Sequence, residues 1–488
     1  MSAHPLPPSP PSPPSGTAAL SGRAWALLLV LCGAVFLEGI DVAMLAVAVP
    51  EIRADLGLST GTAAWVVSAY VIGYAGFTLL GGRAADLLGR RRMFLAWLVV
   101  FLVFSALGGL ATEGWMLIVS RFVTGVASAF MTPAALSVIT TSYPQGPPRN
   151  RALMIYAGTS AGGFSLGLVI GGLLTQFGWR WVFFAPVLLG GVILVAAVRL
   201  VPHDREPMRT SGFDLAGAAT AAGAMLLLTY GIVRLEHGLA GWALTLAAVG
   251  AGLLLVGVFV LVERRVPAPL VRLALLRRAP LVRADLGALL LFGAFFGFQF
   301  MLTLYLQELR GWSSLETSLA LLLMGIDVVL APTVTPLLVN RYGHGRVIVW
   351  GFVLAALAYL LFLPLGADWS YAMMVPSLLF LGVSFGLAYG PLTIAATDGV
   401  DPGEQGLAGG LLQTATQFGA AVGVASVTAV HGLAGTGLDA FRAALVVPAV
   451  LALMGLALAL PGRNGGKPRT AIPTGPVGSR SEPAPLIL

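Results

Sequence analysis

The chain has 488 residues, of which 57% are hydrophobic and only 10% are charged, and 62 are glycines. A soluble globular domain carries about 25% charged residues, so this composition excludes an ordinary soluble protein and indicates a polytopic membrane protein. The formal net charge of +7 calls for no nucleic-acid partner, because basic residues at the cytoplasmic surface of a membrane protein are attracted to anionic lipids.

Apolar runs long enough to cross a bilayer recur along the whole chain, since one crossing takes about 20 residues. Hydropathy and the polar, Gly and Pro breaks between the runs predict fourteen membrane-spanning helices. The first run is too long and too acidic for a cleaved signal peptide, so we expect the N-terminus to be retained. The spans are expected at 24–49, 61–82, 93–111, 115–140, 152–175, 180–201, 212–234, 240–262, 284–307, 315–339, 346–366, 370–397, 405–430 and 440–461.

Basic residues predict the orientation of these spans, because cytoplasmic loops are enriched in Lys and Arg. If the N-terminus is cytoplasmic, the outer connections hold only five of the 28 basic residues. Nearly all the others fall in the tails and the inner connections, so both termini are predicted to be cytoplasmic. The five outer residues are Arg53, Arg180, Arg234, Arg310 and Arg442.

Several function classes are disfavoured by what the sequence lacks. A GxxxxGK phosphate-binding loop needs a lysine, and the only one, Lys467, lies in the C-terminal tail. Five histidines in tails, loops or at a helix end, with a single cysteine, predict no metal site, no cofactor and no internal disulfide. Cys32 is expected to be a small packing residue. The Pro- and Ser-rich tail 1–23 and the low-complexity tail 462–488 are expected to be disordered.

Two acids interrupt the first span. A carboxylate near the bilayer centre costs about 2.5 to 3.5 kcal/mol on insertion scales, so such residues tend to face a cavity or a partner. Glu38 and Asp41 are three residues apart and therefore share one helix face. Two acids so close in a low dielectric resist ionising together, which makes them candidates for binding and releasing a proton. The alternative is that they only form hydrogen bonds to neighbouring helices.

Arg121, in the fourth span, is the expected counter-charge for these acids. From a rise of about 1.5 Å per residue, Asp41 and Arg121 lie at a similar depth toward the outside of their spans. A salt bridge that merely joins two helices is an equally good interpretation. Asp327, at the midpoint of the tenth span, is a third candidate for proton coupling, with a buried interhelical hydrogen bond as its alternative.

Polar amides beside aromatic residues suggest a cavity for an amphipathic small molecule. Gln413 and Gln417 are one helical turn apart, while Gln299 and Phe296 lie in the Phe-rich run "LFGAFFGFQF". The alternative is that these aromatic residues face lipid or the core. The fifth span repeats glycine every fourth residue, which predicts close packing against another helix. These glycines are Gly163, Gly167 and Gly171.

The loop "GGRAADLLGRRRMF" between the second and third spans resembles the signature loop of the major facilitator superfamily, written GxLaDrxGrrxxl. A fainter copy, "LLVNRYGHGR", lies between the tenth and eleventh spans, as expected for two related halves. The matching residues are Gly82, Asp86, Gly89, Arg90 and Arg91.

With fourteen predicted spans, the chain resembles the 14-spanner drug:proton antiporters, the group that includes the QacA and EmrB exporters. "GIDVAMLAVAVP" resembles their first-helix motif lDxTvvnvAlP, and "RFVTGVASA" and "GWRWVFF" also resemble that family. The resemblance implies an all-α major facilitator fold. Its parts would be an N-terminal six-helix bundle (24–201), an inserted helix pair (212–262) and a C-terminal six-helix bundle (284–461).

The sequence departs from these motifs at several positions. Leu168 replaces the proline of the GxxxGPxxGG antiporter motif, which removes an expected helix kink. Leu87 replaces an Arg of the signature loop, and Thr124 stands where the fourth-helix motif often has Gln. Ala43 and Ala46 replace the Thr and Asn of the first-helix motif.

The resemblance implies a proton-driven exporter of lipophilic compounds, cationic ones included, that works by rocker-switch alternating access. Asp41 and Glu38 would bind protons, Arg121 would be their counter-ion, and Asp86 with Arg90 and Arg91 would tie the halves together on the cytoplasmic side. A proton-coupled metabolite symporter and a non-transporting membrane sensor or scaffold are the alternatives. As such an exporter, the protein would have protons, a small-molecule substrate and membrane lipids as partners. Near-exclusive use of Arg over Lys suggests a GC-rich bacterial source, and so a location in the bacterial cytoplasmic membrane.

Overall fold

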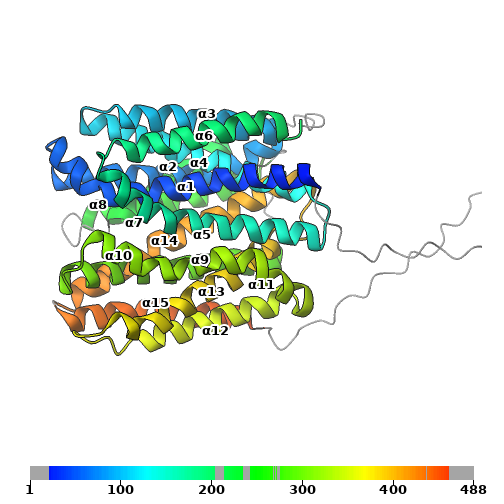
Figure 1. The fold of residues 1–488 in the computed structure, drawn as a ribbon. Helices are drawn as coiled ribbons and strands as arrows, with labels where there is room; N and C mark the ends of the chain where they lie inside the picture. The colour runs from blue at the N-terminus through cyan, green and yellow to red at the C-terminus, as the bar shows by residue number, and fades with distance from the viewer. Residues whose placement is uncertain are drawn as a thin grey trace, which may run out of the picture.

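The computed structural model describes residues 21–203, 214–234, 242–266, 269, 271, 275–435 and 437–460. Across these residues the chain is helical and forms no β-strand. The long helices run back and forth along one common axis (Figure 1). We call the end at which α1 begins and α15 ends the tail end, and the other the far end. Of the two tails predicted to be disordered, only residues 21–23 lie within the described residues.

The helix bounds follow the chain in order. The earlier helices are α1 (Gly22–Asp55), α2 (Thr60–Leu88), α3 (Arg90–Gly109), α4 (Gly114–Ser142), α5 (Pro147–Thr175), α6 (Trp181–Leu200), α7 (Leu215–Arg234) and α8 (Trp242–Glu263). The later ones are η2 (Leu275–Arg277), α9 (Ala279–Leu304), η3 (Tyr305–Leu309), α10 (Ser314–Leu321), η4 (Leu322–Ile326), α11 (Asp327–Tyr342), α12 (His344–Phe362), α13 (Tyr371–Thr397), η5 (Pro402–Glu404), α14 (Gln405–Leu433) and α15 (Leu438–Ala459).

Side-chain caps and glycines fix several helix ends. Ser21 and Ser59 accept hydrogen bonds from backbone N–H groups in the first turns of α1 and α2. Gly89, with φ 102°, joins α2 to α3, and Gly343, with φ 82°, joins α11 to α12. These φ values favour glycine, which lacks a Cβ atom. The signature loop and its fainter copy therefore use the same backbone device at matching junctions.

Each predicted span overlaps a long helix, although residues 212–213 and 240–241 of the seventh and eighth spans lie outside the described residues. The ninth span passes from α9 into the π-helix η3, and the tenth is broken. The expected single helix over 315–339 consists instead of α10, the 3-10 segment η4 and α11. The break lies where α13 presses closest: a Cβ atom on Gly382 would come within 2.4 Å of the Met324 carbonyl oxygen. Tertiary packing, which hydropathy does not report, accounts for this difference.

Twelve helices among the described residues are long and apolar enough to cross a membrane. The two predicted spans outside this set are α7, whose apolar stretch is only Ala216–Ile232, and α14, in which Gly, Thr and Gln dilute the apolar residues. The number of membrane crossings, predicted as fourteen, is thus supported for twelve helices and stays a prediction for the other two.

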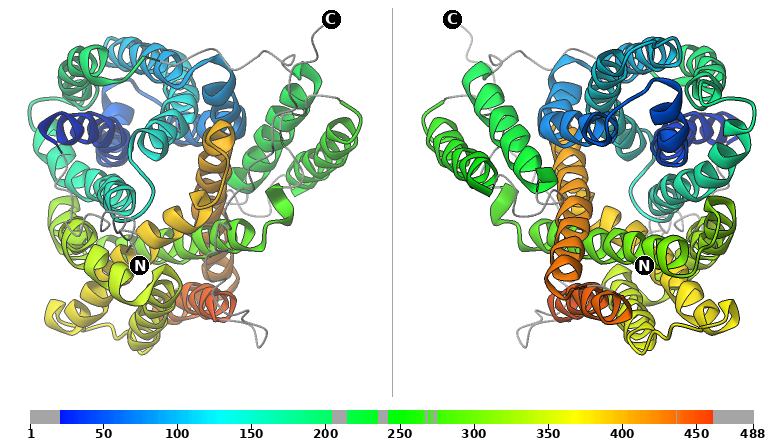
Figure 2. Two further views of the ribbon diagram at one scale, coloured as in Figure 1. Left: turned by 90° about the vertical axis from the view of Figure 1, so that its right-hand side faces the viewer. Right: turned by 90° about the vertical axis from the view of Figure 1, so that its left-hand side faces the viewer.

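Viewed along the common axis, the helices gather in two groups (Figure 2). Helices α1 to α6 form the blue and teal group, and α9 to α15 form the green, yellow and red group. Helices α7 and α8 lie to one side, where α7 packs against α2 and α14. Helix α14, in orange, reaches across from the second group to the first and packs against both α2 and α9.

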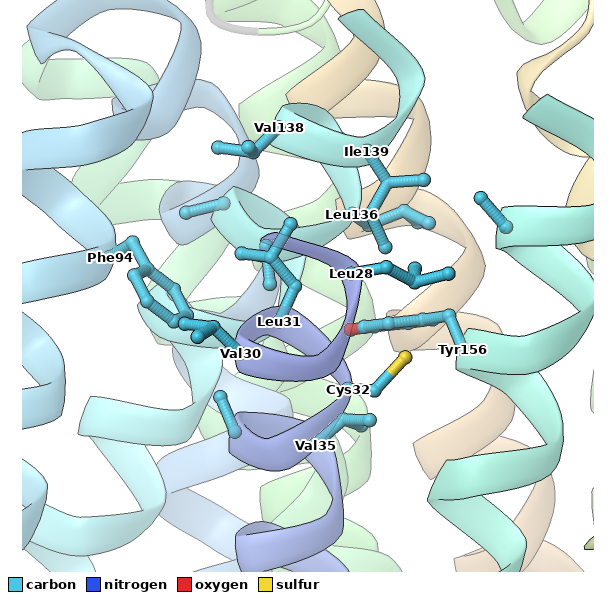
Figure 3. Packing of buried hydrophobic residues seen from close by; sticks show 14 of the residues in the cluster. Leu28, Val30, Leu31, Cys32, Val35, Phe94, Leu136, Val138, Ile139 and Tyr156 are labelled. Carbon is cyan, nitrogen blue, oxygen red and sulfur yellow. The ribbon is translucent and has the colours of Figure 1, made fainter. Parts of the chain in front are cut away.

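The N-terminal half of α1 is enclosed by apolar side chains (Figure 3). Leu28 and Leu31 are fully buried and pack with Leu136 and Ile139 of α4. Cys32 is buried in the same cluster, as its predicted packing role requires. Because this apolar cluster leaves little room for water, the polar groups farther along α1, Glu38 and Asp41, depend on protein partners for their hydrogen bonds.

Candidate functional site: a buried polar track at the centre of the helices

Asp41 and Arg121 form a buried ion pair between α1 and α4. Arg121 Nη1 donates to Asp41 Oδ2 at 2.6 Å, and each side chain is only 2% exposed. The guanidinium of Arg121 also lies 4.6 Å from the ring centroid of Tyr70 on α2, a cation–π distance. The two charges are thus held together with almost no water around them.

Glu38, one turn before Asp41, has a different set of partners. Thr132 Oγ1 of α4 donates to Glu38 Oε2 at 2.5 Å. Tyr156 of α5 donates to the Thr132 carbonyl oxygen at 3.2 Å. The two acids of α1 therefore share a helix face but not their partners: Asp41 is paired with the Arg121 cation, whereas Glu38 accepts from the Thr132 hydroxyl.

The glycine strip of α5 lies against α1 along the stretch that holds both acids. Cβ atoms on Gly163 and Gly171 would lie 2.7 Å from the Phe36 carbonyl oxygen and 2.8 Å from Met44 Cα. Gly167, between them, would lie 2.8 Å from Ile40 Cα. Any larger side chain would push α1 away from α5, so this strip sets the position of Glu38 and Asp41.

Asp327 lies at the first residue of α11, where the broken tenth span resumes as an α-helix. Its Oδ2 atom is buried and has no hydrogen-bond partner among the described residues. A Cβ atom on Gly386 of α13 would lie 3.2 Å from Asp327 Cβ, so α13 covers this acid closely.

The predicted cavity residues divide into two environments. Phe296 packs edge-on against Phe164 of α5, with ring centroids 5.5 Å apart. Gln299 is buried, and its Oε1 atom has no partner among the described residues. Gln413, by contrast, is 6% exposed and bonded on both sides, to Tyr74 and to Tyr389. Gln417, one turn farther along α14, is half-buried.

Asp86 binds the N-terminus of α14 at the tail end. Its Oδ1 and Oδ2 atoms accept the backbone N–H groups of Gly406 at 3.0 Å and Leu407 at 2.9 Å. A carboxylate is stabilised there by unpaired N–H groups and by the helix dipole. Arg90 lies 3.5 Å from the same carboxylate and donates to the Pro402 carbonyl oxygen.

The other signature-loop residues support this contact from both sides. A Cβ atom on Gly82 would lie 2.3 Å from the Gly406 carbonyl oxygen, so only glycine lets α2 and α14 touch at this level. Gly89 supplies the turn into α3. Arg91 donates to the Val198 carbonyl oxygen at 2.6 Å and thereby joins α3 to the end of α6.

Sequence reasoning did not single out four residues of this polar network. Arg149, in the first turn of α5, is buried and donates to the Thr397 carbonyl oxygen at 3.2 Å and to Gln405 Oε1 at 3.1 Å. Tyr74, Thr132 and Tyr156 complete the surroundings of Glu38. The available signal was a row of hydroxyl-bearing residues inside otherwise apolar spans, which becomes informative only when their neighbours are known.

Comparison with known proteins gives this arrangement a family. The Major Facilitator Superfamily model matches residues 31–424. The chain belongs to this superfamily. The predicted superfamily is therefore confirmed, and this major facilitator is a membrane transporter and not an enzyme. Its membership of the 14-spanner subgroup stays a prediction.

Similar proteins carry names that refer to antibiotic export or antibiotic resistance. The chain is 34% identical over 438 residues to the cephamycin export protein CmcT of Amycolatopsis lactamdurans, covering 86% of this chain and 87% of that protein. It is 33% identical to the puromycin resistance protein pur8 of Streptomyces alboniger, covering 84% and 82%. The solved human organic anion transporter MFSD10 covers 89% of this chain and 97% of its own, with a TM-score of 0.64 at 18% identity, and shows the shared fold.

Proposed function

We propose that this major facilitator is a proton-driven antiporter that exports lipophilic drugs or antibiotics, cationic ones included, across the bacterial cytoplasmic membrane. The observation that carries the proposal is the ion pair of Asp41 and Arg121, closed off from water between α1 and α4. Ion pairs that only join helices give little net stability when buried. An acid that is charged in one state and neutral in another is what proton coupling needs.

The cycle follows from the placement of the charged groups. The tail end, where α1 begins and α15 ends, is the cytoplasmic side in this proposal (Figure 1). A proton from outside binds at the acidic pair and weakens the hold of Asp41 on Arg121. The halves then rock, the contacts of Asp86 with α14 separate, and the cytoplasmic side opens. Each charge moved down the membrane potential contributes about 2.3 kcal/mol per 100 mV.

The substrate class is supported by relatives and by side-chain chemistry. The names of the two relatives refer to cephamycin export and puromycin resistance, which favours export over the metabolite symporter despite Leu168. Phe296 and Phe164, from different helices, pack edge to face. Gln299 adds an amide oxygen without a partner among the described residues. Such a combination suits a compound with an aromatic body and a hydrogen-bond donor.

Proton flux in inverted membrane vesicles with an acidic interior tests this function. Ethidium, puromycin and lincomycin are added to vesicles containing wild type, Asp41→Asn or the control Asp439→Asn, which changes an exposed acid of α15. We expect compound-triggered proton efflux in the wild type and the control, and its loss in Asp41→Asn. Energised uptake of a compound into whole cells would instead establish symport, and silence in every assay would overturn a transport role for the acids.

A further inference from the structure

One face of α9 carries an acid, two phenyl rings and an amide. Their spacing along the helix is seven, four and three residues, in the order Asp285, Phe292, Phe296 and Gln299. At 3.6 residues per turn, this spacing keeps the last three within about 40° of the direction of the acid. Phe296 packs against Phe164 of α5, with ring centroids 5.5 Å apart. Since α5 belongs to the first helix group and α9 to the second, this face lies where the two groups meet.

The contacts of the other faces of α9 are consistent with this direction. Toward α14 the backbones come close, because Cβ atoms on Gly293 and Gly297 would lie 3.0 Å and 3.1 Å from backbone carbonyl oxygens of that helix. On another side, Ala284 and Ala288 are buried in an apolar cluster with residues of α12 and α13. By the helical spacing, Asp285 lies between these two packed sides and not on either of them.

Asp285 lacks the kind of partner that Asp41 and Asp86 have. Asp41 is paired with Arg121, and Asp86 accepts backbone N–H groups of α14. The Oδ1 atom of Asp285 is buried but accepts no hydrogen bond from the described residues, and their ion pairs do not include this acid. A carboxylate covered in this way is costly without a partner, and in a membrane helix it marks a pathway or a binding site. A bound cation would supply the partner.

The rest of the face suits an aromatic molecule. The ring of Phe292 lies edge-on to Tyr389 of α13, with centroids 4.9 Å apart, and 5.9 Å from the ring of Phe296. Both phenyl rings are only half-buried, so part of each is open to a ligand. Gln299 adds a buried Oε1 atom without a partner among the described residues. The rings are thus flanked by an anionic acceptor on one side and a neutral acceptor on the other.

We propose that Asp285 binds the protonated amine of an aromatic substrate whose rings lie against Phe292 and Phe296. The inference rests on the proposed export function and narrows its substrate class to aromatic amines that are cationic at neutral pH. Seven residues at about 1.5 Å each place Asp285 about 10 Å from Phe292 along the helix. The acid lies on the side of the tail end, where Leu281 of α9 packs in one cluster with Leu407. A compound entering from the cytoplasm therefore meets the carboxylate first and the rings second.

Equilibrium binding to the full-length protein in lipid nanodiscs tests this site without a proton gradient. The probes are puromycin, which carries a primary amine, and N-acetylpuromycin, in which acetylation removes the positive charge and leaves the rings unchanged. Both affinities are measured by isothermal titration calorimetry at about pH 6, below the ordinary pKa of an α-amino group. We expect puromycin to bind about tenfold more tightly than N-acetylpuromycin, as for one hydrogen bond between charged groups.

Variants assign this preference to the carboxylate. Asp285→Asn keeps the size of the side chain and should abolish the preference while N-acetylpuromycin still binds, and Asp285→Ser replaces it if the first variant fails to fold. Asp285→Glu should retain the preference. Phe292→Leu should weaken the binding of both compounds alike, and Asp439→Asn, which changes an exposed acid, should change neither.

Three results would overturn the proposal. They are an unchanged preference in Asp285→Asn or its replacement, equal affinities of the unchanged protein for the two compounds, and no binding of puromycin.

The outcome is distinguishable from that of the antiport assay. Puromycin binding that depends on Asp285, together with no proton efflux for any compound, would sink the proposed antiport but leave this site standing. Efflux that depends on Asp41, and that puromycin and N-acetylpuromycin trigger equally with or without Asp285→Asn, would leave the antiporter standing and refute the site.

Discussion

Removing Asp41 should destabilise the protein because it leaves the Arg121 charge buried without a counter-ion. Arg121 is 1% exposed, and the ring of Tyr70 lies beside its guanidinium, 4.6 Å from centroid to the guanidinium carbon. Breaking a buried pair by removing one partner costs about 3 to 5 kcal/mol, whereas replacing both partners by apolar residues of similar size is often neutral or stabilising. Asp41→Leu should therefore lose about 3 to 5 kcal/mol, and Asp41→Leu with Arg121→Met should recover nearly all of it.

The assay is the free energy of unfolding in mixed micelles, followed by circular dichroism, for both single variants and the double variant. Asp439→Leu serves as the control, because that carboxylate is 88% exposed and its pair with Arg442 should contribute less than about 1 kcal/mol. A loss below about 1 kcal/mol in Asp41→Leu would refute the reasoning, since it would mean that water reaches Arg121 in the folded protein.

The same double variant separates the two interpretations of the ion pair. If the pair only joins α1 to α4, the apolar replacement should restore transport along with stability. If Asp41 couples protons to transport, stability returns while compound-triggered proton efflux stays absent. Recovery of both would reassign coupling to Glu38 or Asp327.

Three further predictions concern other contacts. Asp86→Asn should raise about tenfold the fraction of molecules in which α2 and α14 are separated at the tail end, because one charge-assisted hydrogen bond to α14 is lost. The distance between spin labels at the exposed positions Leu88 and Asp401 checks this, with Asp439→Asn as the unchanged control. Gly406→Val should prevent α14 from closing against α2, since even a Cβ atom at this position would lie 2.4 Å from the Gly82 carbonyl oxygen. An unchanged distance between the ends of α2 and α14, measured with the same spin labels, would contradict this prediction. Hydrogen bonds from Trp179, and then from Arg180, lower the pKa of the exposed Asp55 carboxyl. The stability that they contribute is complete above the unfolded-state pKa of this carboxyl and is lost as the pH falls through its lower folded-state pKa. The change in Trp179 fluorescence on acidification should therefore vanish in Asp55→Asn.

The sequence was sufficient to place the helices because the membrane imposes one simple requirement, a long apolar run, on each of them. It also placed Asp41 and Arg121 at matching depth, since depth follows from the residue count along a straight helix. The structure brings them to 2.6 Å. The break at η4 was not predicted, because "LLMGI" suits an α-helix and only the approach of Gly382 marks the break.

Contacts between distant helices were the main gap. Gln413 was proposed to line a cavity because polar amides occur beside aromatic residues, and the sequence did not predict that its amide is bonded to Tyr74, 339 residues away in sequence, and to Tyr389. Arg149 looked like an ordinary basic loop residue but is buried against the start of α14. A polar residue in a membrane helix indicates that a polar partner is present, but a single sequence does not identify the helix that supplies this partner.

The glycine contact between α2 and α14 has a consequence for how such a transporter can change over time. Because backbone lies against backbone at Gly82 and Gly406, the surfaces can part without re-packing large side chains. The barrier to parting is then set by a handful of polar groups at the two ends of the contact. Single substitutions among those groups could retune the speed of transport and its response to acidity, while the architecture that folds and inserts into the membrane stays the same.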